Sequence, residues 1–172
     1  MDIKLFITDI DGVWTDGGMY YDTVGGEFKK FNTSDSAGVL FCKLLDIPVA
    51  IITGENSPAV ERRAQKLRIN DCFLHVSNKV KIAEGLLEKY ELGWEQVAYI
   101  GDDINDIDLL EKVGLSACPI SAPYYIQEIV DWVIPTKGGD GVFRHFVEKY
   151  LQKQGLMDHV LKKFKQTKEL EQ

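Results

Sequence analysis

The stretch that decides the fold is LFITDIDGVWTDGG, residues 5–18. An apolar run typical of a buried strand ends at Asp9 and Asp11, two acidic residues that are followed at once by Gly12. Two like charges a few ångströms apart repel each other, and folds keep such a pair mainly where a cation or a reacting group uses it. The alternative interpretation is a solvated loop that happens to carry two acids.

Short apolar runs alternate with helical patterns along most of the chain. PVAIIT at 48–53 and QVAYIG at 96–101 have no polar alternation, as expected of strands that are covered on both faces. Helical patterns lie between them, such as KVKIAEGLLEKY at 79–90. This order predicts an α/β, Rossmann-like fold with a central, mostly parallel sheet and helices on both faces. A length of 172 residues favours one domain, spanning 1–172.

Two segments depart from the alternation. The first holds aromatic, β-rich runs on either side of a glycine-containing turn, which predicts a β-hairpin flap at about 17–31, inserted after the first strand. The second, at about 155–172, predicts a charged helical tail that docks or frays. One side of this tail is apolar and carries Leu156, Val160, Leu161 and Phe164.

The net charge and the positions of the cysteines indicate which binding partners and which cellular compartment to expect. The net charge of -7 leaves no broad basic surface, so we expect no nucleic-acid partner. Cys42, Cys72 and Cys118 lie among apolar neighbours, which favours reduced core thiols over a disulfide framework. No apolar run approaches the roughly 20 residues that span a bilayer, so we expect no membrane partner and a cytoplasmic location.

Polar residues collect where the predicted strands end, which is where open α/β sheets bind ligands. Besides Asp9 and Asp11, Thr53 ends the second strand, Asp102 follows a later one, and Lys79 opens a helix between them. Carboxylate oxygens suit a hard divalent cation such as Mg²⁺. A cation beside a lysine and a hydroxyl forms a positive pocket for a phosphoryl group. These residues predict phosphoryl transfer.

The two aspartates of the first loop are expected to have different roles. A carboxylate held at the end of a rigid strand suits a nucleophile that forms an aspartyl-phosphate, which favours Asp9. Asp11, two residues further on, can donate a proton to the leaving oxygen and later accept one from the attacking water.

These motifs resemble those of a known superfamily. DIDGVWTDG at 9–17, ITG at 52–54, Lys79 and GDDINDIDLL at 101–110 are similar, in this order, to the four motifs of the haloacid dehalogenase superfamily of Mg²⁺-dependent phosphatases. The resemblance covers nearly the whole chain.

The resemblance implies a role for each matching position. Asp9 is the nucleophile and Asp11 the acid/base, while Thr53 and Lys79 bind the phosphoryl group. The side chains of Asp9 and Asp102 and the backbone carbonyl of Asp11 hold Mg²⁺, and the residues that support these ligands are Asp103 and Asp106.

The spacing of the motifs leaves no room for the cap domain that covers the site in most of this superfamily. About 40 residues separate Asp11 from Thr53, and about 25 separate Thr53 from Lys79. A monomer would then have an open site. Either the substrate is a macromolecule or a neighbouring subunit closes the site.

A narrower resemblance favours closure by a neighbour. The hairpin together with NTSDSAG, SNK, VAYIGDD and GGDGVFRHF is similar to the capless tetrameric phosphatases that act on 3-deoxy-ulosonate phosphates. It implies a homotetramer in which the hairpins, with Tyr20, Tyr21 and Phe28, form the interface and each subunit helps to close its neighbour's site. The alternative is a hairpin that packs on its own domain.

Position 55 bears on the substrate within that family. Glu55 is the residue expected of the branch that acts on 2-keto-3-deoxynononate (or a sialic-acid-type) 9-phosphate, with Glu55, Arg63 and Lys66 on the sugar acid and Arg63 reaching a neighbouring subunit. The alternative substrate is 3-deoxy-manno-octulosonate 8-phosphate, used in lipopolysaccharide synthesis. Two further alternatives are a non-catalytic oligomerisation module related to CMP-sugar-acid synthetases and a general or phosphoprotein phosphatase.

Overall fold

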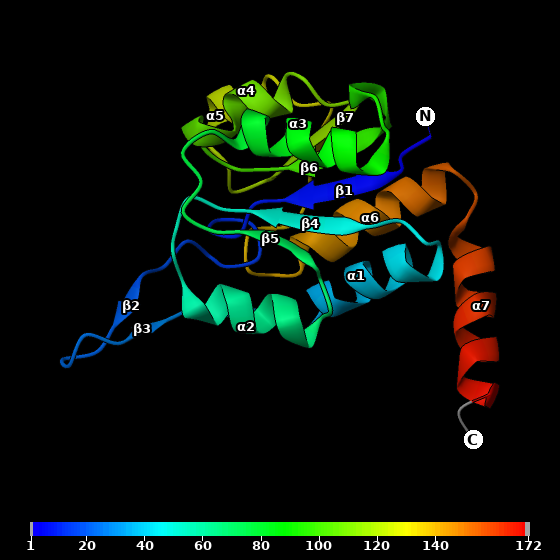
Figure 1. Ribbon diagram of the computed structural model, residues 1–172, viewed down its shortest axis with the longest axis horizontal. Coiled ribbons are helices and arrows are strands. Elements are labelled where there is room, and N and C mark those ends of the chain that lie inside the picture. Colours follow the sequence, from blue (N-terminus) through cyan, green and yellow to red (C-terminus); the bar gives the residue numbers. More distant parts are fainter. Residues whose placement is uncertain (1, 171–172) are drawn as a thin grey trace.

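The computed structural model describes residues 2–170 and is built around one six-stranded sheet (Figure 1). All strand pairs in this sheet are parallel, and the order is β5-β4-β1-β6-β7-β8. The order reverses at β1, so the carboxyl end of β1 opens onto the crevice where such sheets bind ligands. The strands are β1 (Leu5–Thr8), β4 (Val49–Ile52), β5 (Asp71–Phe73), β6 (Val97–Ile100), β7 (Leu115–Pro119) and β8 (Trp132–Ile134).

Helices cover both faces of the sheet, as Figure 1 shows. One face carries α1 (Asp35–Leu44), α2 (Pro58–Lys66) and α6 (Val142–Lys153). The other carries α3 (Lys79–Tyr90), α4 (Ile107–Leu110) and α5 (Tyr124–Gln127), with the short turns η1 (Trp94–Gln96) and η2 (Ile104–Asp106) beside them. The predicted α/β class with helices on both faces is confirmed.

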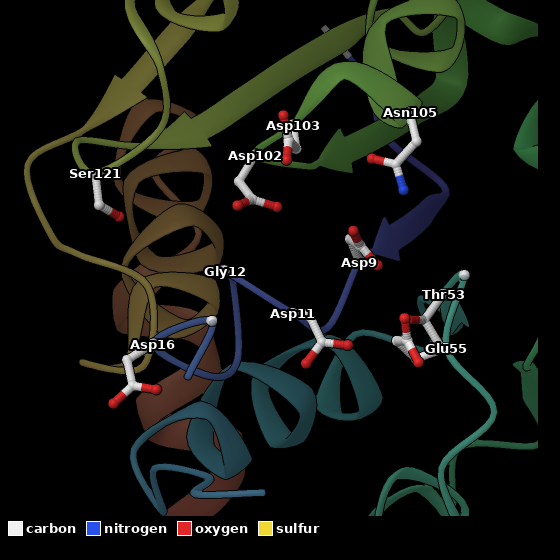
Figure 2. A pocket seen from close by; sticks show the side chains of 12 residues that line it. Asp9, Asp11, Gly12, Asp16, Thr53, Glu55, Asp102, Asp103, Asn105 and Ser121 are labelled. Atoms are coloured by element: carbon white, nitrogen blue, oxygen red, sulfur yellow. The ribbon is translucent and has the colours of Figure 1, made fainter. Parts of the chain in front are cut away.

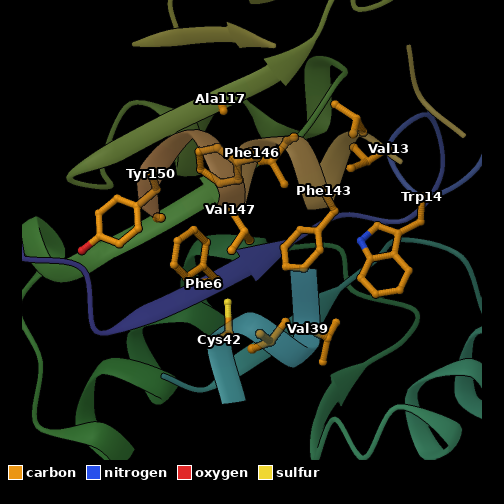
Figure 3. Close-up of a cluster of buried hydrophobic side chains, with 14 of the residues drawn as sticks. Phe6, Val13, Trp14, Val39, Cys42, Ala117, Phe143, Phe146, Val147 and Tyr150 are labelled. Carbon is orange, nitrogen blue, oxygen red and sulfur yellow. The ribbon is translucent and has the colours of Figure 1, made fainter. Parts of the chain in front are cut away.

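Successive side chains of a strand point to opposite faces of the sheet, so each strand contributes to two hydrophobic cores, one on each face. In β1, Phe6 faces the α1–α6 side, whereas Leu5 and Ile7 face the α3–α4 side. The ring of Phe6 packs edge-on against Phe146 and Tyr150 of α6, with centroids 5.5 Å away in each case (Figure 3). Such pairs add about 0.5–1.5 kcal/mol each to the burial of their apolar area.

The loop after β1 is fastened to this core by Trp14. Its indole ring is fully buried, packs 5.2 Å from the ring of Phe143, and donates from Nε1 to Thr8 Oγ1 at 2.9 Å. The turn that carries the predicted site is therefore held by the aromatic core beneath it.

The flap is present as a two-stranded antiparallel hairpin of β2 (Tyr20–Tyr21) and β3 (Glu27–Phe28) that projects from the body (Figure 1). The Asp22 carboxylate accepts hydrogen bonds from the backbone N–H groups of Val24 and Gly26, which closes the turn. Within residues 2–170 no cap domain is inserted at either of the expected positions, as the spacing predicted.

Two features go beyond the predicted fold. The three-residue edge strand β5 was not predicted, because a run of this length has no readable periodicity. The terminal helix α7 (Met157–Leu170) contacts α1 and α6 and buries Val160 in the core, while positions 171 and 172 of the predicted tail lie outside the described residues. No helix within residues 2–170 is long and apolar enough to cross a membrane.

Candidate active site

The loop after β1 brings its acids against the loop after β6. Asp9 follows β1 directly and donates its backbone N–H to Ile100 O at 3.0 Å. Gly12 has φ +77°, and a Cβ at this position would lie 1.8 Å from Asp102 Oδ2. Glycine is therefore required here on two counts, a left-handed backbone and the close approach of the Asp102 carboxylate.

Lys79 is the buried cation of the site. It begins α3, whose cap Asn78 accepts from the N–H of Lys81, and its side chain is 3% exposed. Its Nζ lies 2.8 Å from Asp9 Oδ2 and 2.6 Å from Asp106 Oδ1. A lysine buried to this extent needs its charge compensated, and two carboxylates compensate it here.

Asp106 is the anchor of this network. Its Oδ1 accepts from Lys79 and from the buried hydroxyl of Tyr99, and its Oδ2 accepts from the N–H groups of Asp102 and Asp103 at 2.8 and 3.1 Å. Both oxygens are thus engaged within the chain. Asp106 therefore supports the loop and the lysine through these hydrogen bonds, and its expected role beside metal ligands stays a prediction.

Carboxylate oxygens of Asp9, Asp102 and Asp106 lie within 4.8 Å of one another, which makes them a candidate cation site. Because Asp106 is already saturated by donors, the oxygens best placed to bind a cation belong to Asp9 and Asp102. An all-oxygen donor set of this kind suits Mg²⁺ and similar hard cations.

The electrostatics of the acid cluster fit a cation. Burial, together with the charge of Asp106, raises the pKa of Asp9 to about 7, although Lys79 acts in the opposite direction. Burial, with the charges of Asp9, Asp106 and Asp103, raises the pKa of Asp102 to about 8. One ammonium is outnumbered by buried carboxylates, and a divalent cation would remove the remaining repulsion.

A cavity of about 320 Å³ opens over these residues (Figure 2). Asp9, Asp11 and Asp102 line it from two loops, Thr53 and Glu55 line it from the loop after β4, and Asp103 lies at its edge. The structure thus brings most of the predicted site residues to one cavity, with Lys79 directly behind Asp9. Thr53 is 1% exposed, so its position is fixed by packing.

Arg63 and Lys66 do not line this cavity. Arg63 Nη2 donates to Asn32 O at 3.2 Å and to Ser36 Oγ at 2.9 Å within the same chain. Lys66 is exposed on the last turn of α2. Direct contact with a sugar acid bound in the same subunit is therefore not supported, and their expected role stays a prediction for an assembly of several chains.

Other residues at the site were not predicted. Asp16, Asn105 and Ser121 also line the cavity. Ser121 Oγ accepts from Gly138 N at 3.0 Å, and a Cβ on Gly138 would lie 1.8 Å from Gly12 O. The glycine-rich sequence GGDG at 138–141 is thus a close-packed support for the Asp11–Gly12 turn, a purpose that its composition alone could not reveal.

Comparison with known proteins agrees with this geometry. A model of the haloacid dehalogenase-like hydrolase family matches residues 68–146. The 3-deoxy-D-manno-octulosonate 8-phosphate phosphatase of Escherichia coli is 40% identical over 91% of this chain and 84% of its own. The nine-carbon specificity expected from Glu55 is not confirmed, since this relative and the similar phosphatase of Haemophilus influenzae carry the eight-carbon name.

Two solved structures are also similar. The cobalt-bound deoxy-D-mannose-octulosonate 8-phosphate phosphatase of Haemophilus influenzae has a TM-score of 0.86 and 39% identity, covering 90% of each chain. The octulosonate 8-phosphate phosphatase of Moraxella catarrhalis, in complex with magnesium, phosphate and KDO, has a TM-score of 0.90 and 32% identity, covering 94% of this chain and 93% of its own. The chain described here therefore belongs to the haloacid dehalogenase-like hydrolases, among the phosphatases that have no cap domain.

Proposed function

We propose that this protein is a Mg²⁺-dependent phosphatase that hydrolyses 3-deoxy-manno-octulosonate 8-phosphate through an aspartyl-phosphate intermediate. The observation that carries the proposal is the placement of Asp9 between a buried lysine and a second carboxylate, Asp102, at the floor of the cavity. The names of the relatives support the eight-carbon sugar acid as the substrate.

In the first half of the reaction Asp9 attacks phosphorus. Its Oδ1 accepts the N–H of Ile10 at 2.8 Å and its Oδ2 lies 2.8 Å from Lys79 Nζ, so the carboxylate is held in one orientation before the attack. A carboxylate–phosphorus bond forms as the ester bond breaks. Lys79 and the hydroxyl of Thr53 stabilise the charge on the equatorial oxygens.

Asp11 handles the proton in both halves. It donates a proton to the departing sugar-acid oxygen, and then removes one from the water that attacks the phosphorylated Asp9. The water oxygen bonds to phosphorus, phosphate leaves, and the Asp9 carboxylate is restored. Mg²⁺ held by Asp9, Asp102 and the backbone carbonyl of Asp11 would supply positive charge to the transferring phosphoryl group.

A second candidate substrate rests on Glu55. This residue lines the cavity and is exposed to it, where an acid can accept hydrogen bonds from hydroxyl or amide groups of a longer sugar acid. It gives no positive charge for the substrate carboxylate, so that charge would come from Arg63 or Lys66 of a neighbouring chain. The 9-phosphate of a deoxynononate is therefore the competing substrate.

We infer that the working form is a homotetramer held together by the hairpins. The side chains of Tyr20, Tyr21 and Phe28 are 45%, 67% and 60% exposed on a segment that projects from the body. Exposed aromatic side chains gathered on a short edge hairpin are typical of an interface. A neighbour at this position would help to close the open cavity, and we expect the assembly in the cytoplasm.

The test is phosphate release with Mg²⁺ from the octulosonate 8-phosphate and the deoxynononate 9-phosphate in parallel, with Asp9→Asn as the inactive control. We expect the higher kcat/KM for the eight-carbon ester. A higher value for the nine-carbon ester would move the assignment to the second candidate, and Glu55→Arg should then reduce that preference. If neither ester releases phosphate, the oligomerisation module becomes the better interpretation.

A further inference from the structure

Lys29 connects the hairpin to Asp11. It follows β3 directly, between two exposed residues, Phe28 and Lys30, yet its own side chain is 1% exposed. Its Nζ lies 2.7 Å from Asp11 Oδ1 and 3.3 Å from Glu27 Oε1. The hairpin therefore places a buried positive charge on the expected acid/base.

The two oxygens of the Asp11 carboxylate differ in their surroundings. Oδ1 accepts from Lys29, and the hydroxyl of Thr15 lies 3.3 Å from it. Oδ2 is buried and accepts no hydrogen bond from the described residues. Asp11 lines the cavity and its side chain is 25% exposed, so Lys29 and Thr15 fix the orientation of a carboxylate that faces the site.

A purely structural role explains Lys29 poorly. Burial of an ammonium is costly, and apolar residues in place of a whole buried ion pair would fasten the hairpin about as well. The segment that follows the hairpin is also attached to the body at another point, because Asn32 Nδ2 donates to Gly139 O at 3.1 Å. The charge of Lys29 is therefore better explained by an effect on its partner, Asp11.

We propose that Lys29 is a positioning residue for Asp11. It holds Oδ1 and so fixes the orientation of the Asp11 carboxylate, and it thereby makes the proton transfer to the departing alcohol depend on the placement of the hairpin. This inference rests on the proposed phosphatase function. It assigns no contact between Lys29 and the substrate.

The test separates proton donation from all other steps by varying the leaving group. An alkoxide such as that of the octulosonate ester needs a proton as it leaves, whereas p-nitrophenolate departs as a stable anion. Lys29→Met should lower kcat/KM for the octulosonate ester by about 10- to 100-fold, since general acid catalysis contributes about 10²–10⁴-fold. It should change kcat/KM for p-nitrophenyl phosphate by less than about threefold.

Matched variants control for charge and folding. Lys30→Met removes an exposed neighbouring lysine and should leave kcat/KM for both substrates unchanged. Lys29→Arg keeps the positive charge and should recover part of the kcat/KM that Lys29→Met loses for the octulosonate ester. Lys29→Gln provides a second variant if the methionine protein does not fold, which circular dichroism would show.

An equal loss of kcat/KM for both substrates would overturn the proposal in favour of a fastening role. If kcat/KM falls for neither substrate, Lys29 has no role in the reaction. If wild-type protein fails to hydrolyse the octulosonate ester, the proposed substrate is wrong but the inference is still tested. Phenyl and p-nitrophenyl phosphate then replace the pair, and an unchanged ratio of their kcat/KM values in Lys29→Met would overturn it.

Discussion

The sheet has an amino edge, where the parallel strands begin, and a carboxyl edge, where they end. An aspartate, a lysine and a tyrosine meet at each of these edges, with different consequences. At the amino edge, Asp71 begins β5 and bonds to Lys89 Nζ at 2.6 Å and to the hydroxyl of Tyr90. One carboxylate meets one ammonium, and the lysine is 51% exposed. The charges balance, and this group can be understood entirely as a fastening of α3 to β5.

At the carboxyl edge, an aspartate, a lysine and a tyrosine again meet, as Asp106, Lys79 and Tyr99. Here the lysine is buried, and Asp9 and Asp102 add two further carboxylates. Burial and the charge of Asp106 raise the pKa of Asp9 to about 7, and burial with the charges of Asp9, Asp106 and Asp103 raises the pKa of Asp102 to about 8. The same residue types occur in the structural cluster at the amino edge, so they do not by themselves mark a functional site. The carboxyl edge differs because its carboxylates outnumber its one buried ammonium.

The largest expected contrast between the edges comes from removing one carboxylate at each. Asp9→Asn should lower kcat by about 10⁴-fold or more, because it removes the nucleophile. Its melting temperature should stay equal or rise, because the raised pKa of Asp9 means that its charge opposes folding.

Asp71→Asn is the matched control for this contrast. It should leave kcat unchanged and lower the melting temperature by a few degrees, because it weakens a balanced pair. Steady-state kinetics and thermal unfolding measure both effects. Loss of activity in Asp71→Asn, or a large destabilisation in Asp9→Asn, would remove the distinction between the edges.

Mg²⁺ should stabilise the protein more at pH 8 than at pH 5. The folded-state pKa values of Asp9 and Asp102 are above the ordinary aspartate value of 3.8. Their contribution to stability is therefore complete below about pH 4 and is lost as the pH rises through about 7 and 8 when no metal is present. Ionised carboxylates at pH 8 are the form that binds the cation.

At a concentration 100 times Kd, Mg²⁺ should add about 2.7 kcal/mol at pH 8, or roughly 5–10 °C in melting temperature. Thermal unfolding in EDTA and in Mg²⁺ at both pH values measures this. Asp102→Asn should abolish the response and Asp71→Asn should keep it. A response equal at both pH values would argue against a cation site built from these carboxylates.

Parts of this contrast could be predicted from the sequence, and the reason lies in the sheet. The carboxyl ends of parallel strands meet at one edge, so Asp9, Thr53 and Asp102 could be placed together from their positions after apolar runs. Tyr99 could not, because VAYI is an apolar run in which nothing marks the tyrosine as polar in function.

Side-chain direction was the other limit. Lys29 lies in a hairpin whose pattern predicts a turn but does not show which side chain folds back to the body. The resemblance implied that Arg63 meets the sugar acid by reaching a neighbouring subunit, which stays a prediction, and the sequence did not show that Arg63 contacts Asn32 and Ser36 within its own chain. Both directions are set by packing between segments far apart in sequence.

The smallest expected difference between the two edges comes from removing one tyrosine hydroxyl at each. Tyr99 is fully buried and donates to Asp106, which also holds Lys79. Tyr99→Phe leaves Asp106 with one donor fewer, so we expect Lys79 to be less firmly held and kcat/KM to fall by about tenfold, the cost of one hydrogen bond to a charged group.

Tyr90→Phe removes the equivalent hydroxyl from Asp71 and should leave kcat/KM unchanged. Steady-state kinetics of the two variants, together with the inhibition constant of inorganic phosphate, separates the cases. Weaker phosphate inhibition in Tyr99→Phe alone would show that the hydroxyl acts through the phosphate-binding lysine. Equal behaviour of both variants would mean that Tyr99, like Tyr90, only fastens the fold, and that the functional part of the edge ends at the charged groups.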